Sequence, residues 1–254
     1  MSNSKATDEK ADFTKAAAKL KEAMAYRNAR RYESALRAID DALLIQPASD
    51  IAWLTRGVVL AELGRCNESL ACFDKLLEFD PSSAVAYRLK GGTFEMQGSY
   101  EKAAECFLRA VDLEPANADL RLNLANSYKK QKKYEDALKV YRQMLEREPQ
   151  NPKNQYYVGV ALADLGKYDE AIGFFDEALR RKPDFDDAAL AKGFVLTKLG
   201  RKDEAKQCTD KLLEVEKEQP ADAKGRDYAS MNDSCRQDFE ASQRKFKDNF
   251  APPK

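Results

Sequence analysis

Histidine is absent from this sequence, so the commonest general base and metal ligand is missing. A metal site would have to be built from the five cysteines and from carboxylates. The cysteines never occur at the C-x2–4-C spacing of zinc sites. An odd number of cysteines without that spacing indicates a reducing compartment rather than a disulfide scaffold, so we expect a cytoplasmic protein. The sequence therefore predicts no metal and no cofactor.

Catalytic motifs are also missing. Gly159 followed by Gly166 and Lys167 could suggest a phosphate-binding loop, but a Walker loop needs five steps between its glycines and Ser or Thr after the lysine. Here the two glycines are seven residues apart, and Tyr168 follows the lysine. The acidic pairs fit solvated helix faces and helix starts: Asp40-Asp41, Asp169-Glu170 and Asp186-Asp187. We therefore predict that the chain is not an enzyme.

The charge balance narrows the class of partner. Of 254 residues, 34% are charged, with Lys+Arg and Asp+Glu equal at 43 each. Binding of nucleic acid or of a membrane surface needs a net positive face, so neither partner is expected. No stretch approaches the roughly 18 apolar residues of a membrane helix. Mixed charges at this density are typical of helices with large solvated faces.

The elements that would position any site come from an internal repeat. Five prolines lie 34 residues apart, at Pro47, Pro81, Pro115, Pro149 and Pro183. They define five units, and a sixth keeps the period but has Lys217 in place of proline. The units are 16–49, 50–83, 84–117, 118–151, 152–185 and 186–219.

Two columns of the repeat predict that each unit is a pair of interlocked helices. One column holds only small residues: Ala23, Gly57, Gly91, Ala125, Gly159 and Gly193. The other holds mostly large ones: Ile39, Phe73, Phe107, Tyr141, Phe175 and Thr209. Between the columns, glycine recurs where it can end a helix in the left-handed conformation, at Gly64, Gly98, Gly166 and Gly200. Unit one has Arg30 there. Each unit therefore reads as helix, tight turn, helix and short loop.

These columns resemble the tetratricopeptide repeat family, whose pattern is W-x2-L-G-x2-Y, then A-x3-F, then P, at a period of 34. The closest matches are Trp53 with Gly57, Tyr87 with Gly91 and Phe94, Ala103 with Phe107, and Ala171 with Phe175 and Pro183. The resemblance covers 16–219. It implies an all-α fold, an α-solenoid wound as a right-handed superhelix of about six units. In this family the first helices line a concave groove that usually holds a peptide or a partner's helix.

The two ends lie outside the repeat. Residues 1–15 form an N-terminal extension, in which about 1–7 are expected to be loose and a helix to begin a few residues before Ala16. Residues 220–254 carry apolar residues at roughly helical spacing, and we expect a capping helix over about 222–248 with a frayed tail. Unit six departs from the pattern at Thr209 and Lys217, so its second helix is the least regular.

The resemblance places a stripe at i, i+4, i+7 and i+11 of each first helix in the groove. In units two and three the stripe is mainly apolar: Ile51, Val58, Val85, Leu89 and Met96. In unit four it is polar, with Asn123, Asn126 and Lys130. Asparagine is a weak helix former, so we expect replacement of both by Ala to leave the fold intact and to weaken ligand binding. The alternative is that these polar side chains are merely solvated.

Chaperone-adaptor members of this family hold a peptide's terminal carboxylate with Lys and Asn from one unit, Asn from the next, and Lys and Arg from a third. Units three to five offer Arg88, Asn123 and Lys153 at three of these five places. Gly92 and Tyr157 stand at the other two. Arg and Lys differ in geometry, so the resemblance implies an anion-tolerant pocket rather than a true clamp.

The sequence thus predicts a non-catalytic scaffold that binds a peptide or partner helix in the groove. The alternative is a structural subunit whose groove is permanently filled by a partner or by another copy of the chain. The partner's identity and the oligomeric state stay open, with a monomer among the options.

Overall fold

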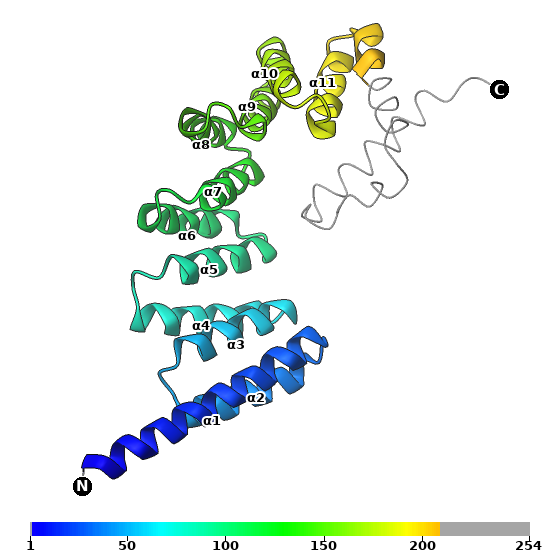
Figure 1. Cartoon of the computed structure of the whole chain (residues 1–254). Coiled ribbons are helices and arrows are strands. Elements are labelled where there is room, and N and C mark those ends of the chain that lie inside the picture. The colour runs from blue at the N-terminus through cyan, green and yellow to red at the C-terminus, as the bar shows by residue number, and fades with distance from the viewer. Residues whose placement is uncertain (1, 209–254) are drawn as a thin grey trace, which may run out of the picture.

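The computed structural model describes residues 2–208, with side chains from residue 12, and this part of the chain is helical without strands (Figure 1). Eleven helices have defined bounds: α1 (Ser2–Asn28), α2 (Tyr32–Ile45), α3 (Asp50–Glu62), α4 (Cys66–Phe79), α5 (Ala84–Met96), α6 (Tyr100–Leu113), α7 (Ala118–Lys130), α8 (Tyr134–Arg147), α9 (Pro152–Asp164), α10 (Tyr168–Arg181) and α11 (Asp186–Lys198). Helical residues continue over 202–208.

The helices pack as consecutive hairpins in a curved stack, as Figure 1 shows from the blue N-terminal end to the yellow end. Each odd-numbered helix from α1 to α9 packs against the even-numbered helix that follows it, and each of these pairs contacts the next odd-numbered helix. The first helices of neighbouring pairs also touch directly, α3 against α5 and α9 against α11. The predicted all-α solenoid is therefore confirmed.

The tight turns inside the pairs have a left-handed residue. The expected glycines have φ of 76°, 72°, 75° and 77° at Gly64, Gly98, Gly166 and Gly200. In the two remaining pairs, Arg30 and Lys132 take the same conformation, with φ of 56° and 60°. The next backbone N–H then bonds back to the helix, as from Lys133 to the Tyr128 oxygen at 2.9 Å. This bond satisfies a helix-end carbonyl in all six turns.

The loops between pairs carry a capping residue that the proline register did not reveal. Two residues after a proline, Ser49, Ser83, Asn117 and Asn151 accept hydrogen bonds from N–H groups in the first turn of the next helix. Such N-caps typically stabilise a helix by about 1 kcal/mol. Proline ends one helix, and the cap sets where the next begins.

The two repeat columns meet inside each pair. A Cβ added at Gly57 would lie 2.5 Å from the Phe73 ring, and one at Gly159 would lie 2.6 Å from the Phe175 ring. Both rings are fully buried. The predicted interlocking of small and large residues is therefore confirmed at these contacts, and glycine allows the ring to lie against the helix backbone.

The ends of the chain differ from the expectation in one respect. Helix α1 begins at Ser2, earlier than the start expected a few residues before Ala16, so residues 2–7 are helical rather than loose. This stretch has no glycine or proline to stop a helix. The predicted cap over 222–248, Thr209, Lys217 and the frayed tail lie outside the described residues.

Candidate binding face on the first helices

The apolar part of the predicted stripe lies on α3 and α5. Ile51, Val85 and Met96 are 65%, 41% and 60% exposed, which is high for large apolar side chains. Val58 and Leu89 lie between them and are half-buried. Helices α3 and α5 touch directly, and we call these five side chains the apolar stripe.

The polar part of the predicted stripe lies on α7 and α9. Asn123 is half-buried, and its amide makes no hydrogen bond with any residue in 2–208. Lys153 is exposed, as are Lys130 of α7 and Arg88 of α5. The amide of Asn123 is therefore available to a ligand, and Lys130 follows two turns later on the same helix.

Asn126 has a structural partner that the sequence reasoning missed. The Tyr141 hydroxyl of α8 donates a hydrogen bond of 2.9 Å to Asn126 Oδ1. Tyr141 is 2% exposed, so its hydroxyl needs an acceptor inside the protein. The expectation that the fold does not need these amides therefore fails for Asn126. The signal was a tyrosine at 141 in a column where three other units have phenylalanine.

The Tyr141 ring also links Asn126 to α9. Tyr157 stacks on it with ring centroids 5.4 Å apart and an interplanar angle of 17°. Tyr157 in turn lies 5.5 Å from Tyr156, whose ring lies 5.3 Å from Phe185. Tyr157 is thus fixed by aromatic packing at the place where a chaperone clamp would have arginine.

Charged residues at the ends of the first helices tie neighbouring pairs together. Lys129 Nζ lies 3.4 Å from Asp164 Oδ2, and Arg27 pairs with Glu62. The Ser127 hydroxyl donates to Glu95 Oε1 at 2.6 Å. Lys129, the neighbour of the candidate ligand contact Lys130, thus has a partner within the protein.

Two of these carboxyl groups have perturbed acidity. Burial raises the pKa of Glu95, against the opposing effects of the Ser127 hydrogen bond and the Lys130 charge. Burial likewise raises the pKa of Asp164, although Lys129 opposes the rise. Both groups serve contacts between helix pairs, and neither has a paired acid nearby for acid–base chemistry.

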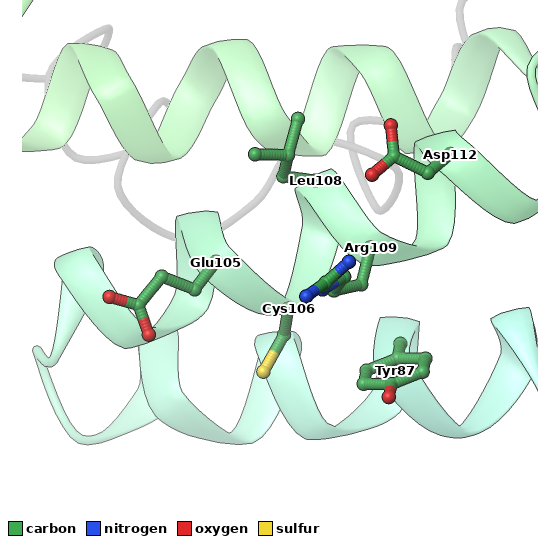
Figure 2. A pocket seen from close by; sticks show the side chains of 6 residues that line it. All are labelled: Tyr87, Glu105, Cys106, Leu108, Arg109 and Asp112. Carbon is green, nitrogen blue, oxygen red and sulfur yellow. The ribbon is translucent and has the colours of Figure 1, made fainter. Parts of the chain in front are cut away.

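A depression of about 420 Å³ lies elsewhere, on α5 and α6 (Figure 2). Its lining mixes aromatic, apolar and charged side chains: Tyr87, Glu105, Cys106, Leu108, Arg109 and Asp112. Figure 2 shows these side chains spread along the helices rather than converging on one point. The arrangement offers no catalytic pairing.

The cysteines show no metal-binding arrangement. Cys72 and Cys106 are buried and Cys66 and Cys208 are half-buried, none of them in a disulfide, and Cys235 lies outside the described residues. Burial raises the pKa of the Cys72 thiol and of the Cys106 thiol, which keeps both protonated. Over residues 2–208 no cluster of three potential ligands occurs. Within the same range, none of the helices has the length and apolarity needed to cross a membrane.

Family comparison agrees with the repeat and the fold. Models described as tetratricopeptide repeat or TPR repeat match residues 22–91, 94–132, 122–184 and 162–225. Together they span nearly all of the six predicted units. The chain belongs to the tetratricopeptide repeat family.

Several solved structures share this tetratricopeptide fold at low identity. YrrB, described as a TPR protein with an unusual peptide-binding site, is 24% identical with a TM-score of 0.55, over 71% of this chain and 93% of that one. The pilF protein of Pseudomonas aeruginosa is 19% identical with a TM-score of 0.61, over 82% and 95%. MamA of Desulfovibrio magneticus RS-1 is 17% identical with a TM-score of 0.59, over 68% and 97%. No curated protein sequence matches the chain.

Proposed function

We propose that this tetratricopeptide repeat protein is a non-catalytic scaffold that binds a peptide or a partner helix along its first helices. The observation that carries the proposal is the apolar stripe, where Ile51, Val85 and Met96 are between 41% and 65% exposed. Burying a large apolar side chain contributes roughly 1.5–3 kcal/mol, so covering such a stripe favours a complex.

The polar end of the same face supports a ligand with a peptide backbone. The Asn123 amide can donate to a backbone carbonyl and accept from a backbone N–H. Arg88, Lys130 and Lys153 would accommodate an acidic ligand residue near it. Together with the apolar stripe, this arrangement suits a ligand that is apolar in one half and polar or acidic in the other. The YrrB description shows that a related fold can bind peptides.

The cytoplasmic location expected from the sequence belongs to the same proposal. Its support is that none of the four cysteines in the described residues forms a disulfide, which is typical of a reducing compartment.

A display library of random dodecapeptides tests the proposal. A selected peptide is expected to lose roughly tenfold or more in affinity when Ile51 and Val85 are both replaced by Glu, since the apolar contacts are lost. Leu44→Glu is the matched control, because Leu44 is 82% exposed on α2 and lies outside the stripe. Equal losses in both variants, or none in either, would reject binding at the apolar stripe.

The alternative of a structural subunit keeps some support. Phe79 and Leu113 are 50% and 40% exposed at the same register position of α4 and α6, so apolar side chains on the second helices are accessible for assembly. Sedimentation velocity over a range of concentrations separates the two functions. A scaffold with an exchangeable ligand stays monodisperse, whereas a subunit that lacks its partner associates, and Phe79→Ser then reduces the association.

A further inference from the structure

One exposed face of α6 combines acidic and apolar side chains. Glu101, Glu105, Leu108 and Asp112 follow one another at i, i+4, i+7 and i+11, so they form one row along the helix, which we call the α6 row. All four are exposed, and Leu108 is 44% exposed, which is high for a large apolar side chain. The last three residues of the row line the depression of about 420 Å³, together with Tyr87 of α5 (Figure 2).

The acids of the α6 row have no counter-charge within the described part of the chain. None of the three forms an ion pair or a side-chain hydrogen bond with another residue in 2–208. In the matching row of α4, by contrast, both acids are paired, Asp74 with Lys90 and Glu78 with Lys75. Arg109 is the one cation that lines the depression, so this face of α6 keeps an excess of negative charge.

The repeat does not require an exposed leucine at position 108. In three other units an aspartate takes this register and pairs with a cation on the next first helix: Asp40 with Arg56, Asp74 with Lys90 and Asp176 with Lys192. In α7 the residue in the register of those cations is Leu124, which is 3% exposed and part of the core. Leu108 therefore has no ion-pair role, and its exposed surface is available to a partner.

Other apolar side chains lie close to Leu108. Tyr87 is half-buried beside it in the lining of the depression, and the uncharged Cys106 thiol is buried there. Leu113, at the end of α6, is 40% exposed. A ligand side chain that covers these groups removes apolar surface from water, which favours binding.

The neighbouring pair α7/α8 has the opposite charge at the same six register positions. In α5/α6 these positions hold two acids and one base, and in α7/α8 they hold four bases and one acid. The residues are Tyr87, Glu105, Leu108, Arg109, Asp112 and Leu113 in the first pair and Arg121, Lys139, Arg142, Gln143, Glu146 and Arg147 in the second. A basic ligand is therefore attracted to α5/α6 and repelled by α7/α8, which restricts where it can lie.

We propose that the α6 row and the depression beside it bind a basic segment of a partner protein, in which Lys or Arg residues flank an apolar side chain. The apolar side chain would cover Leu108 and Tyr87, and the cations would pair with Glu105 and Asp112. This site lies on a second helix, whereas the proposed peptide-binding face lies on the first helices and suits an apolar or acidic ligand. The two sites can therefore be tested separately.

The probe is a labelled dodecapeptide of lysine, leucine and alanine, with lysine and leucine at helical spacing. Fluorescence anisotropy with the full chain measures its affinity. Two matched peptides carry glutamate in place of every lysine or serine in place of every leucine. We expect the basic amphipathic peptide to bind roughly tenfold more tightly than either. Equal binding of the serine peptide would mean attraction by charge alone, and equal binding of the glutamate peptide would mean that charge has no role. Either result overturns the proposal.

The charge variant combines Glu105→Gln with Asp112→Asn and is expected to bind the basic peptide roughly tenfold more weakly. The matched control combines Glu135→Gln with Glu146→Gln, which removes two exposed acids from the corresponding row of α8 and should change nothing. Leu108→Asn is the apolar variant, and it should fold because aspartate of the same shape takes this register in three units. Its affinity should fall in the same way, with a melting temperature close to that of the wild type. Equal losses in the control, or none in either variant, overturn the proposal.

One further variant and one further measurement exclude the other occupants. Ile51→Ser combined with Val85→Ser alters the apolar stripe and should leave binding of the basic peptide unchanged, so a loss there would place the peptide on the first helices and overturn the proposal. Sedimentation velocity tests for a second copy of the chain on the α6 row. Self-association of the wild type that Leu108→Asn abolishes would assign the row to a second copy and likewise overturn the proposal.

Discussion

The pairs α5/α6 and α7/α8 have the same backbone plan and different chemistry. Their first helices both have 13 residues and their second helices both have 14. The turn residue is left-handed in each, Gly98 at φ 72° and Lys132 at φ 60°. In one pair Gly91 lies beneath Phe107, and in the other Ala125 and Tyr141 take those register positions. The fold thus depends on a few columns and tolerates variation within them.

The exposed faces of the two pairs diverge much further. On the first helices, Leu89 and Met96 of α5 give way to Asn123 and Lys130 of α7. Elsewhere, Tyr87 and Leu113 of α5/α6 give way to Arg121 and Arg147 of α7/α8. The backbone plan does not change across these replacements, so the helix pair does not need one particular residue type at these positions. This difference puts the polar residues of the proposed peptide site, Asn123 and Lys130, on α7.

The largest expected effect concerns the close contact in α5/α6. A Cβ at Gly91 would lie 2.8 Å from the Phe107 ring, so Gly91→Val is expected to destabilise the protein by about 3 kcal/mol through overpacking. Urea denaturation measures the loss. Gly92→Ala is the control, because nothing lies within 4 Å of its added Cβ, and it should stabilise the helix slightly. If Gly91→Val were as stable as the wild type, the interlocking contact would not be needed.

The next effect separates the two asparagines of α7. Asn126→Ala removes the acceptor of the buried Tyr141 hydroxyl and is expected to cost about 1–3 kcal/mol. Asn123→Ala is the matched control, because the Asn123 amide makes no hydrogen bond within residues 2–208. It should leave stability unchanged or raise it by about 0.6 kcal/mol. In a double-mutant cycle, Asn126→Ala and Tyr141→Phe should not add, because they remove the same bond. Additive losses would mean that the hydrogen bond contributes nothing to stability.

The sequence alone predicted the fold well because its signals are periodic. The prolines, the small and large columns and the turn glycines recur at a fixed spacing. Every unit therefore indicates the same order of helix, turn and helix. Caps such as Ser49 and Asn117 follow prolines at a constant distance and could have been predicted from the same register. The early start of α1 at Ser2 could not have been predicted in this way, because no repeat unit precedes α1 to mark where the helix begins.

The candidate site was harder to predict because its residues act through neighbours that lie far apart in the sequence. The bond from Tyr141 to Asn126 spans 15 residues, and the ion pair of Lys129 with Asp164 spans 35. Whether a polar side chain on a first helix serves the fold or a ligand depends on such contacts. The period of the repeat indicates only which positions of a first helix share one face of that helix.

A smaller effect tests the turns of the two pairs. Lys132 has φ of 60°, which strains a residue with a Cβ, whereas Gly98 takes the same conformation without strain. Lys132→Gly should stabilise the protein by about 0.5–1 kcal/mol after the entropic cost of glycine. Lys133→Gly is the control: its φ is −85°, so glycine there should only destabilise. Thermal unfolding that ranks the two variants the other way would contradict the strain argument.

The smallest effect concerns Glu95, where α5 meets α7. Burial raises the pKa of Glu95 in the folded protein, so its contribution to stability is fully present below the unfolded pKa and is lost as pH rises through the folded pKa. Near pH 7 the charged carboxylate therefore carries a cost. Glu95→Gln removes the charge and keeps an oxygen that can accept from Ser127.

We expect Glu95→Gln to gain about 0.5 kcal/mol or less near pH 7 and nothing near pH 4, where the wild-type carboxyl is already largely protonated. Urea denaturation across that range measures the difference, and Glu105→Gln, at an exposed place on α6, should show no such pH dependence. A loss of stability near pH 7 in Glu95→Gln would mean that attraction to Lys130 outweighs burial. In that case Lys130 would make a net favourable charge interaction with Glu95, in contrast to Asp164, where burial outweighs the attraction of Lys129.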